Sequence, residues 1–348
     1  MKKIIICAVA LLAMLVTSCS NDDIEISRKT TIKVNPYGVI SGFPEEYPGE
    51  LTSFDQSCKL RIRVLAYDKD GVLAYSDSSF VNNYQTEMSV PTSLPTGTYT
   101  IIATTDVVLY SGGKVTDEAW NISEKSNIND VILKARQESA LFGGEYNILG
   151  IGYKTQSISE DTQSIEISPS PAGALLRIYY DNVLSYSDVK YYYLLSNRGC
   201  NFVSFDSNGN PRLIPENNGN QFDFLYTYTD ADYARSQEWN TTYGYSFIFP
   251  VDNVGFQFKW EDEKEQSYDM GNSFTISSIK SGEEWNITVN CDTDEVNYSK
   301  YTSSSTRSVT DESVPLFLNK NEEKKTMMGF SSMNSNSGRM KLKDLIKK

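Results

Sequence analysis

Residues 60–67, Leu-Arg-Ile-Arg-Val-Leu-Ala-Tyr, alternate between apolar and charged side chains before becoming wholly apolar. Successive side chains of a β-strand point to opposite faces, so this alternation predicts a strand with one buried face and one solvent-exposed face that carries Arg61 and Arg63. Residues 68–71, Asp-Lys-Asp-Gly, follow directly, and residues 72–75 resume the apolar pattern. This is typical of a β-hairpin whose glycine supplies a positive φ.

Strand-forming residues continue along the chain, which contains 23 tyrosines and 15 phenylalanines together with polar turn residues. Aromatic and β-branched residues favour strands, and no long amphipathic helix is evident after the N-terminal segment. The sequence therefore predicts an all-β fold of antiparallel sandwiches. Beyond residues 60–67 and 72–75, strands are expected at 30–37, 86–91, 97–108, 130–136, 145–153, 163–168, 174–180, 188–205, 243–250, 254–261 and 284–291.

The N-terminus has the layout of a secretory signal. Two lysines precede an apolar stretch over residues 4–16, and Ser18-Cys19 follows. The stretch is too short to span a membrane as a helix. A cysteine after small residues resembles the lipobox of bacterial lipoproteins, which implies cleavage between Ser18 and Cys19 and acylation of Cys19. The alternative is an ordinary signal peptide with an incidental cysteine.

The polar residues after Cys19 indicate where such a lipoprotein would reside. Residues 20–23, Ser-Asn-Asp-Asp, resemble the export signal that sends Bacteroidetes lipoproteins to the outer face of the outer membrane. A lipid-anchored protein that is exposed on the cell surface is therefore expected. The periplasmic face remains the alternative, because any tether between acyl chains and a folded body needs polar residues.

The charge and the missing histidine exclude several function classes. The formal net charge is −13, which disfavours binding to nucleic acid or to anionic lipid headgroups. The chain contains no histidine, which removes the commonest general base and the commonest zinc ligand. A protein without enzymatic activity, cofactor or metal is expected. A hydrolase with a carboxylate pair in a cleft is the remaining enzymatic alternative.

The cysteines beyond Cys19 do not form a recognisable framework. Cys58, Cys200 and Cys291 are odd in number and widely spaced, so neither a set of disulfides nor a metal site is indicated. Buried thiols are expected, with one disulfide at most.

Two short sequence patterns recur along the chain and suggest tandem domains. The Asp68–Gly71 pattern recurs as residues 206–209, Asp-Ser-Asn-Gly, and residues 94–101 resemble residues 279–287, where an aromatic residue follows a turn. A Pro/Ser/Gly segment at 168–173 marks the expected boundary. The predicted organisation is a signal peptide (1–18), a lipidated tether (19–29), an N-terminal β-sandwich (30–170), a C-terminal β-sandwich (171–300) and a flexible tail (301–348), with a long loop near 210–240.

Three further patterns have competing interpretations. Asp68 and Asp206 begin fragments of a calcium loop, but the downstream glutamate is missing and a hairpin turn is favoured. The acidic run 261–265 is read as a solvated hairpin tip. Tyrosines offer flat faces to sugar rings, although neighbours along a strand point to opposite faces and half of them are expected in the core. These aromatic residues are Tyr191, Tyr192, Tyr193, Tyr226, Tyr228, Tyr233, Trp239, Tyr243 and Tyr245.

The lipobox, the acidic segment after it, the Tyr67–Gly71 turn and residues 94–101, Leu-Pro-Thr-Gly-Thr-Tyr-Thr-Ile, together resemble the Bacteroidales fimbrillin-type surface lipoproteins. The resemblance implies two transthyretin-like β-sandwiches and a role as a fimbrial subunit, anchor or accessory adhesin. In that family a protease cuts after an arginine and opens a groove that the next subunit's strand fills.

Arg28 is the early candidate for such a cut, and its alternative role is that of a solvated tether residue. A cut there would release the lipid without removing the first strand, which departs from the family's pattern and leaves an anchor or accessory subunit as plausible as a polymerising one. The expected partners are the outer membrane, through the lipid, and other fimbrial subunits. A glycan-binding lipoprotein of a polysaccharide-uptake system, which meets host or bacterial glycans, is the alternative function.

Overall fold

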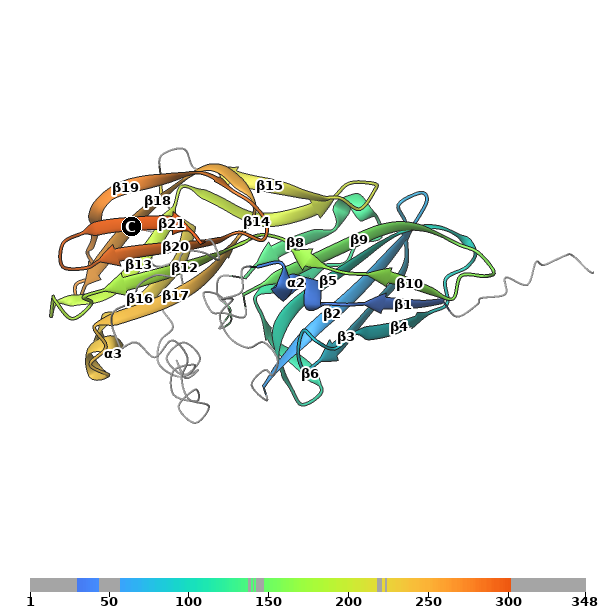
Figure 1. Cartoon of the computed structure of the whole chain (residues 1–348), viewed down its shortest axis with the longest axis horizontal. Helices are drawn as coiled ribbons and strands as arrows, with labels where there is room; N and C mark the ends of the chain where they lie inside the picture. The colour runs from blue at the N-terminus through green and yellow to red at the C-terminus, as the bar shows by residue number, and fades with distance from the viewer. Residues whose placement is uncertain are drawn as a thin grey trace, which may run out of the picture.

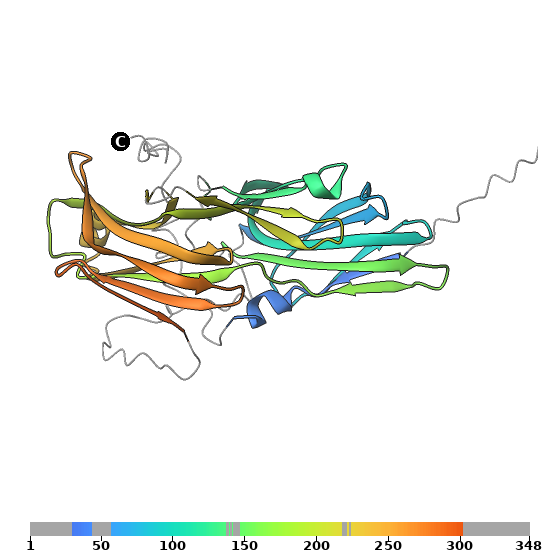
Figure 2. The ribbon, with the colours of Figure 1, turned by 90° about the horizontal axis from the view of Figure 1, so that it is seen from above.

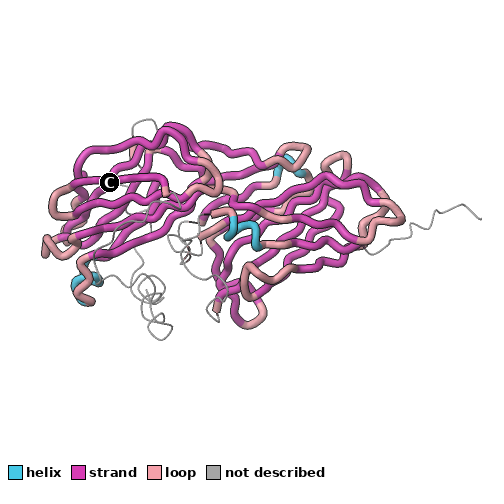
Figure 3. Tube along the Cα trace, in the orientation of Figure 1, coloured by secondary structure: helices cyan, strands magenta, loops and turns pink. Residues whose placement is uncertain are grey.

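Strands form nearly all of the regular structure in the computed structural model, which describes residues 30–43, 57–136, 139, 141, 147–217, 221–222 and 224–301. The strands build two adjoining bodies along one long axis, as the ribbon shows from two directions (Figures 1 and 2). Helical segments are short and peripheral (Figure 3). The predicted all-β fold with antiparallel sheets is confirmed. The helical segments are α2 (Tyr37–Ser41), the 3-10 turn η1 (Ile128–Asp130) and α3 (Ala231–Ser236).

A six-stranded sheet, the central sheet, lies in the middle of the first body, with strand order β11-β9-β5-β2-β3 and β6 paired to β5. Its long strand β5 is buried without interruption from Tyr99 to Val108, so both faces of the sheet are covered. The strands of the central sheet are β2 (Cys58–Asp68), β3 (Leu73–Val81), β5 (Gly97–Ser111), β6 (Lys114–Glu118), β9 (Leu149–Ile158) and β11 (Ser170–Pro171).

The first face of the central sheet is covered by a three-stranded sheet, the N-terminal sheet, ordered β10-β1-β4. A Cβ added to Gly152 of β9 would approach Ile167 of β10 to 2.8 Å, and one on Gly150 would approach Val39 of α2 to 2.3 Å. These glycines therefore permit the two layers to pack closely. The strands of the N-terminal sheet are β1 (Thr30–Val34), β4 (Met88–Thr92) and β10 (Ser164–Ile167).

The opposite face is covered by a four-stranded sheet, the bridging sheet, ordered β15-β14-β8-β7. Arg61 and Arg63 of the central sheet donate to the carbonyl oxygens of Trp120 and Ile122 of β7, at 3.0 and 2.8 Å. The prediction that these arginines lie on a solvent-exposed face is therefore wrong. The strands of the bridging sheet are β7 (Trp120–Ser123), β8 (Ile132–Ala135), β14 (Arg198–Phe205) and β15 (Pro211–Asn217).

The second body consists of two four-stranded sheets, ordered β17-β12-β20-β21 and β16-β13-β18-β19, which face each other over a shared core. Strand β12 runs parallel to β20 and antiparallel to β17. The strands are β12 (Ala174–Asp181), β13 (Val189–Ser196), β16 (Phe224–Asp230), β17 (Thr241–Ile248), β18 (Val251–Asp262), β19 (Ser267–Ile279), β20 (Glu284–Asn290) and β21 (Glu295–Lys300).

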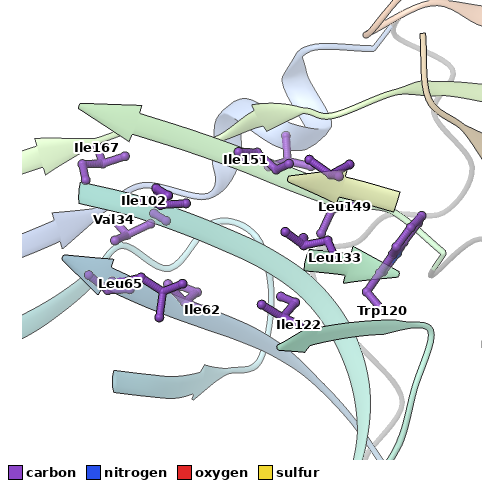
Figure 4. Close-up of a cluster of buried hydrophobic side chains, with 14 of the residues drawn as sticks. Val34, Ile62, Leu65, Ile102, Trp120, Ile122, Leu133, Leu149, Ile151 and Ile167 are labelled. Carbon is purple, nitrogen blue, oxygen red and sulfur yellow. The ribbon is translucent and has the colours of Figure 1, made fainter. Parts of the chain in front are cut away.

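Two hydrophobic cores result, and the first one includes residues from both parts of the sequence. Figure 4 shows part of the first core, where Trp120, Ile122 and Leu133 of the bridging sheet face the central sheet. Trp120 also contacts Phe247 and Phe249, with ring centroids 5.7 and 5.3 Å apart. The residues that later segments contribute to the first core are Leu175, Val203, Phe205, Phe247 and Phe249.

The β14–β15 hairpin crosses the predicted boundary between the N-terminal and C-terminal domains. The segment 168–173 does separate strands of the central sheet from β12, but this later hairpin returns to pair with β8, at Val203↔Leu133. The predicted long loop at 210–240 is wrong, because this region forms β15, β16 and α3. The domain ranges 30–170 and 171–300 stay a prediction about folding units. The signal peptide, the tether and the tail from residue 302 lie outside the described residues.

Candidate functional site

The predicted N-terminal sites can be placed only through the strand that follows them. Ser18, Cys19 and Arg28 lie outside the described residues, and the description begins at Thr30, the first residue of β1. Thr30 stands two residues after Arg28, so a cut at that arginine leaves the whole of β1 in the chain.

Strand β1 is the central strand of the N-terminal sheet. The backbone N–H groups of Thr31 and Asn35 donate to Gln163 and Ile167 on the β10 side, both at 3.0 Å. On the β4 side, the Thr92 hydroxyl donates to the carbonyl oxygen of Thr30 at 2.8 Å. The side chains of Ile32 and Val34 are fully buried. The part of the chain that leads directly to the predicted lipid site is therefore held by hydrogen bonds on both sides and by apolar packing.

Strand β4 forms an edge of this sheet and contains a proline one residue before its end. Pro91 lies opposite Thr31 in the antiparallel register, and β4 pairs with β1 alone in the described sheets. A proline removes one N–H donor, and its place on an edge strand reduces the tendency of that edge to pair with another chain.

The acidic turns serve as hairpin caps. Asp68 Oδ1 accepts from the N–H groups of Asp70 and Val72, both at 2.9 Å. Asp206 repeats this with Asn208 and Asn210, and its carboxylate also accepts from the Asn210 amide. This amide bond is the main reason that the pKa of Asp206 lies below its ordinary value. The hairpin interpretation of both motifs is confirmed, because the carboxylates accept bonds from their own turns.

The acidic run at 261–265 contains a third turn of this type. Asp262 Oδ1 accepts from the N–H groups of Lys264 at 2.9 Å and Gln266 at 2.8 Å. The fourth residue of each turn has a positive φ, which is 77° at Gly71, 82° at Gly209 and 60° at Glu265. The predicted hairpin tip is thus confirmed for residues 262–265, but the prediction of a solvated side chain is wrong for Glu261, which is buried in β18. The sequence search missed its kinship with the other two turns because glutamate stands where they have glycine.

A buried network of charges joins the central sheet to β6 and β7. Arg61 Nε and Nη2 donate to the two carboxylate oxygens of Asp106 at 2.9 and 2.6 Å. Its Nη1 donates to Glu118 at 2.6 Å. Burial opposes the charge of Arg61, but Asp106 and Glu118 outweigh it and raise the pKa of Arg61. Asp106 is fully buried, so this pair of carboxylates holds a guanidinium and does not line a cleft.

A second buried ion pair lies in the second body, where Arg177 of β12 pairs with Glu284 of β20. The Arg177 guanidinium carbon lies 5.9 Å from the centre of the Tyr301 ring, a cation–π distance. Among the residues that the structure describes, no group of three or more Asp, Glu or Cys side chains is arranged to hold a metal ion. Within the same residues, no helix combines the length and the apolar character that crossing a bilayer requires.

Three of the tyrosines proposed for sugar contact, Tyr192, Tyr193 and Tyr226, are buried, and Tyr191 is half-buried. Because the neighbours Tyr192 and Tyr193 are both buried, the expected alternation between core and surface does not hold at this point of β13. Tyr233 and Trp239 pack against each other at 5.7 Å, and the Tyr228 side chain lies outside the described residues. Tyr243 is 37% exposed and lies between Tyr179 and Tyr245, at ring distances of 6.4 and 5.5 Å. Tyr243 and Tyr245 of β17 were both predicted, and Tyr179 of β12, which the sequence did not single out, extends them into a row of three.

The cysteines follow the prediction where they are described. Cys58 is buried in the first core and Cys291 in the second, where it is a free thiol. Burial, with Asp181 and Asp294 nearby, raises the pKa of Cys291 far above its ordinary value. The side chain of Cys200 lies outside the described residues.

No family model and no curated protein matches the sequence. Among solved structures, a putative polysaccharide binding protein of Bacteroides thetaiotaomicron is similar at 12% identity and a TM-score of 0.41, over 80% of this chain and 99% of that one. A putative adhesin from the same organism is similar at 9% identity and a TM-score of 0.42, over 77% and 95%. The fimbrial anchor protein Mfa2 of Porphyromonas gingivalis is similar at 13% identity and a TM-score of 0.39, over 78% and 95%. The structures to which this chain is similar thus include putative adhesins and fimbrial proteins of Bacteroidales and a putative polysaccharide binding protein.

Proposed function

We propose that this chain is a non-enzymatic, lipid-anchored protein of the outer-membrane surface that acts as a fimbrial subunit, anchor or accessory adhesin. The observation that carries the proposal is the position of β1. The predicted acylation site Cys19 stands shortly before a strand that is already the central strand of a sheet. A tether built in this way is fixed to the folded body and holds it at the membrane.

The role of anchor or accessory adhesin is favoured over that of a polymerising subunit. Strand addition needs a groove, and a groove in the N-terminal sheet would appear if β1 were removed. A cut at Arg28 leaves β1 between β4 and β10, with Ile32 and Val34 in the core. Other fimbrial subunits would then join this protein by strand addition at another edge.

A Cys19→Ala strain tests this proposal, with Glu25→Ala as the matched control, which lies in the same tether but outside the export segment 20–23. We expect the wild type and the control to be cleaved by protease on whole cells and to co-purify with surface filaments, and the Cys19→Ala protein to be lost from the envelope. An Arg28→Ala strain should still incorporate the protein. Protection of the wild type from external protease would contradict a surface role.

Glycan binding is the second candidate, and the row formed by Tyr179, Tyr243 and Tyr245 supports it. Aromatic rings on a flat sheet face stack against the apolar faces of sugar rings. If the protein is exposed on cells but never associates with filaments, affinity gels should show retardation by a surface polysaccharide. A Tyr243→Ala variant should abolish that retardation, and a Tyr186→Ala variant, also exposed, should not.

A further inference from the structure

Strands β1 and β10 run parallel, with Thr31 opposite Ser164 and Val34 opposite Ile167. Their first residues lie at the end of the molecule that is remote from the second body, where the Thr30 hydroxyl donates to Thr162 in the turn before β10 at 3.2 Å. Figure 1 shows β1 starting at this end, at the right of the view. The N-terminal end of β1 therefore lies on the side of the molecule opposite the second body.

The last residues of the two strands lie at the junction between the bodies. A Cβ on Gly38, just after β1, would approach the carbonyl oxygen of Pro169 to 2.6 Å. Gly42 in turn lies against Gly282 of the second body, whose N–H donates to Gly173 at 2.9 Å. The chain runs from β10 through β11 into β12 at the same place. One path for a force on the second body therefore enters the N-terminal sheet at the C-terminal end of β10, and a second path enters the bridging sheet through the β14–β8 pair.

We propose that the parallel pair of β1 and β10 is a shear clamp that holds the folded body on its N-terminal tether under tension. This proposal rests on the proposed function, which supplies the tension between the membrane and a fimbria or host surface. A pull on the start of β1 and a pull on the end of β10 act in opposite directions along the strands. All the hydrogen bonds between the strands are then loaded together, whereas peeling from one end would break them singly.

Apolar packing of β1 and its pairing with β4 reinforce the clamp. Ile32 and Val34 are fully buried, so sliding β1 out of the sheet also exposes apolar surface to water. Strand β4 pairs with β1 from Thr30↔Thr92 to Val34↔Met88, and it resists the same displacement. The N-terminal strand is thus held by two ladders and two buried side chains along the line of force.

Force-clamp measurements on the purified mature chain test the proposal by changing only the direction of the load. One handle is fixed at the N-terminus. The second is attached either at Asp292, in the second body, or at Asp161, in the turn before β10; both are exposed. At the same force, β1 should survive at least about tenfold longer with the handle at Asp292. This follows because two or more bonds of about 1 kcal/mol each must break together. Equal lifetimes in the two geometries would overturn the clamp.

A matched pair of proline variants tests whether the β1–β10 pairing is what resists the applied force. Thr31→Pro deletes the N–H that donates to Gln163, and it should shorten the lifetime in the Asp292 geometry about fivefold. Ser89→Pro places the same ring on edge strand β4, opposite Lys33, in the register of the existing Pro91. It should leave the lifetime unchanged.

Equal effects of the two variants would overturn the assignment of the clamp to the β1–β10 pair. Failure of the clamp leaves the cellular proposal standing, because filament association and surface exposure are measured without applied force. A working clamp in a protein that never reaches the surface would contradict the function alone.

Discussion

The sheets of the two bodies differ in how much of their surface is buried. Strand β5 of the first body is buried on both faces from Tyr99 to Val108, whereas β19 of the second body has exposed residues along most of its length. The first body has three layers because the β14–β15 hairpin and β7–β8 cover the face of the central sheet that carries Arg61. The second body has two sheets over one core. Whether a polar face is wet or dry thus depends on which distant segment covers it.

The largest effect should come from breaking the charge network that this third layer buries. Asp106→Ala removes the main partner of a buried guanidinium and should destabilise the protein by about 3–5 kcal/mol. The matched control is Asp70→Ala, which removes an exposed partner of Lys69 and should cost less than about 1 kcal/mol. Urea denaturation of both variants measures the difference. A loss below 1 kcal/mol for Asp106→Ala would show that the covering layer does not desolvate the pair.

A second comparison asks whether the hairpin from the second half of the sequence stabilises the first core. Val203 of β14 and Val254 of β18 are both fully buried, one in each core. Each Val→Ala change should cost about 2 kcal/mol, from two lost methyl contacts and a small cavity. Val203→Ala should lower the stability of the first body, and Val254→Ala that of the second.

Tryptophan fluorescence separates the two outcomes. Trp120 lies in the first core, and Trp239, Trp260 and Trp285 pack against the second. Replacing the last three by phenylalanine leaves Trp120 as a single reporter. The unfolding midpoint reported by Trp120 fluorescence should fall more in the Val203→Ala variant than in the Val254→Ala variant. The opposite order would mean that β14–β15 is only an appendage of the second body.

The sequence predicted local structure well, but it did not predict which segments cover which faces of the sheets. Alternation and turn chemistry located the strand at residues 60–67, the turn at Asp68 and the strand that begins at Gly97, because these signals lie within a few residues. The same alternation predicted a solvent-exposed face for Arg61, since nothing near this residue in the sequence reveals that β7 lies over it. The long loop expected at 210–240 is wrong for a different reason: its polar residues form β15, which pairs with the preceding β14, β16, which pairs with β13, and the helix α3.

The candidate sites show the same division. Cys19 was identified from its immediate neighbours, and its acylation stays a prediction outside the described residues. The tyrosines were recognised as a class, but composition could not sort Tyr192, which is buried, from Tyr243, which is exposed. The role of β1 could not be foreseen, because its position between β4 and β10 is a property of sheet order.

The three aspartate-capped turns allow a smaller comparison. Gly209→Ala puts a side chain at φ 82° and a Cβ at 2.6 Å from the Thr100 Cγ2 methyl, and it should destabilise the protein by about 1–2 kcal/mol. Glu265→Gly relieves a positive φ at the equivalent position and should stabilise by up to about 1 kcal/mol. Thermal unfolding measures both changes. Stabilisation by Gly209→Ala would show that the hairpin tip does not rest on β5.

The smallest effect concerns the Asp206 carboxyl in one of these turns. Bonds from the Asn210 amide and from backbone N–H groups hold its pKa below the ordinary value of about 3.9. The folded pKa is thus lower than the unfolded one. The carboxylate therefore adds stability above the unfolded pKa, and this stability is lost as the pH falls through the folded pKa.

Asn210→Val reproduces the residue that occupies this position in the Asp68 turn, where Val72 supplies a backbone N–H and no amide. We expect NMR titration to show the Asp206 pKa moving up in this variant without reaching the unfolded value, because the two backbone donors remain. An unchanged pKa would show that the Asn210 amide does not contribute to the depression of the Asp206 pKa.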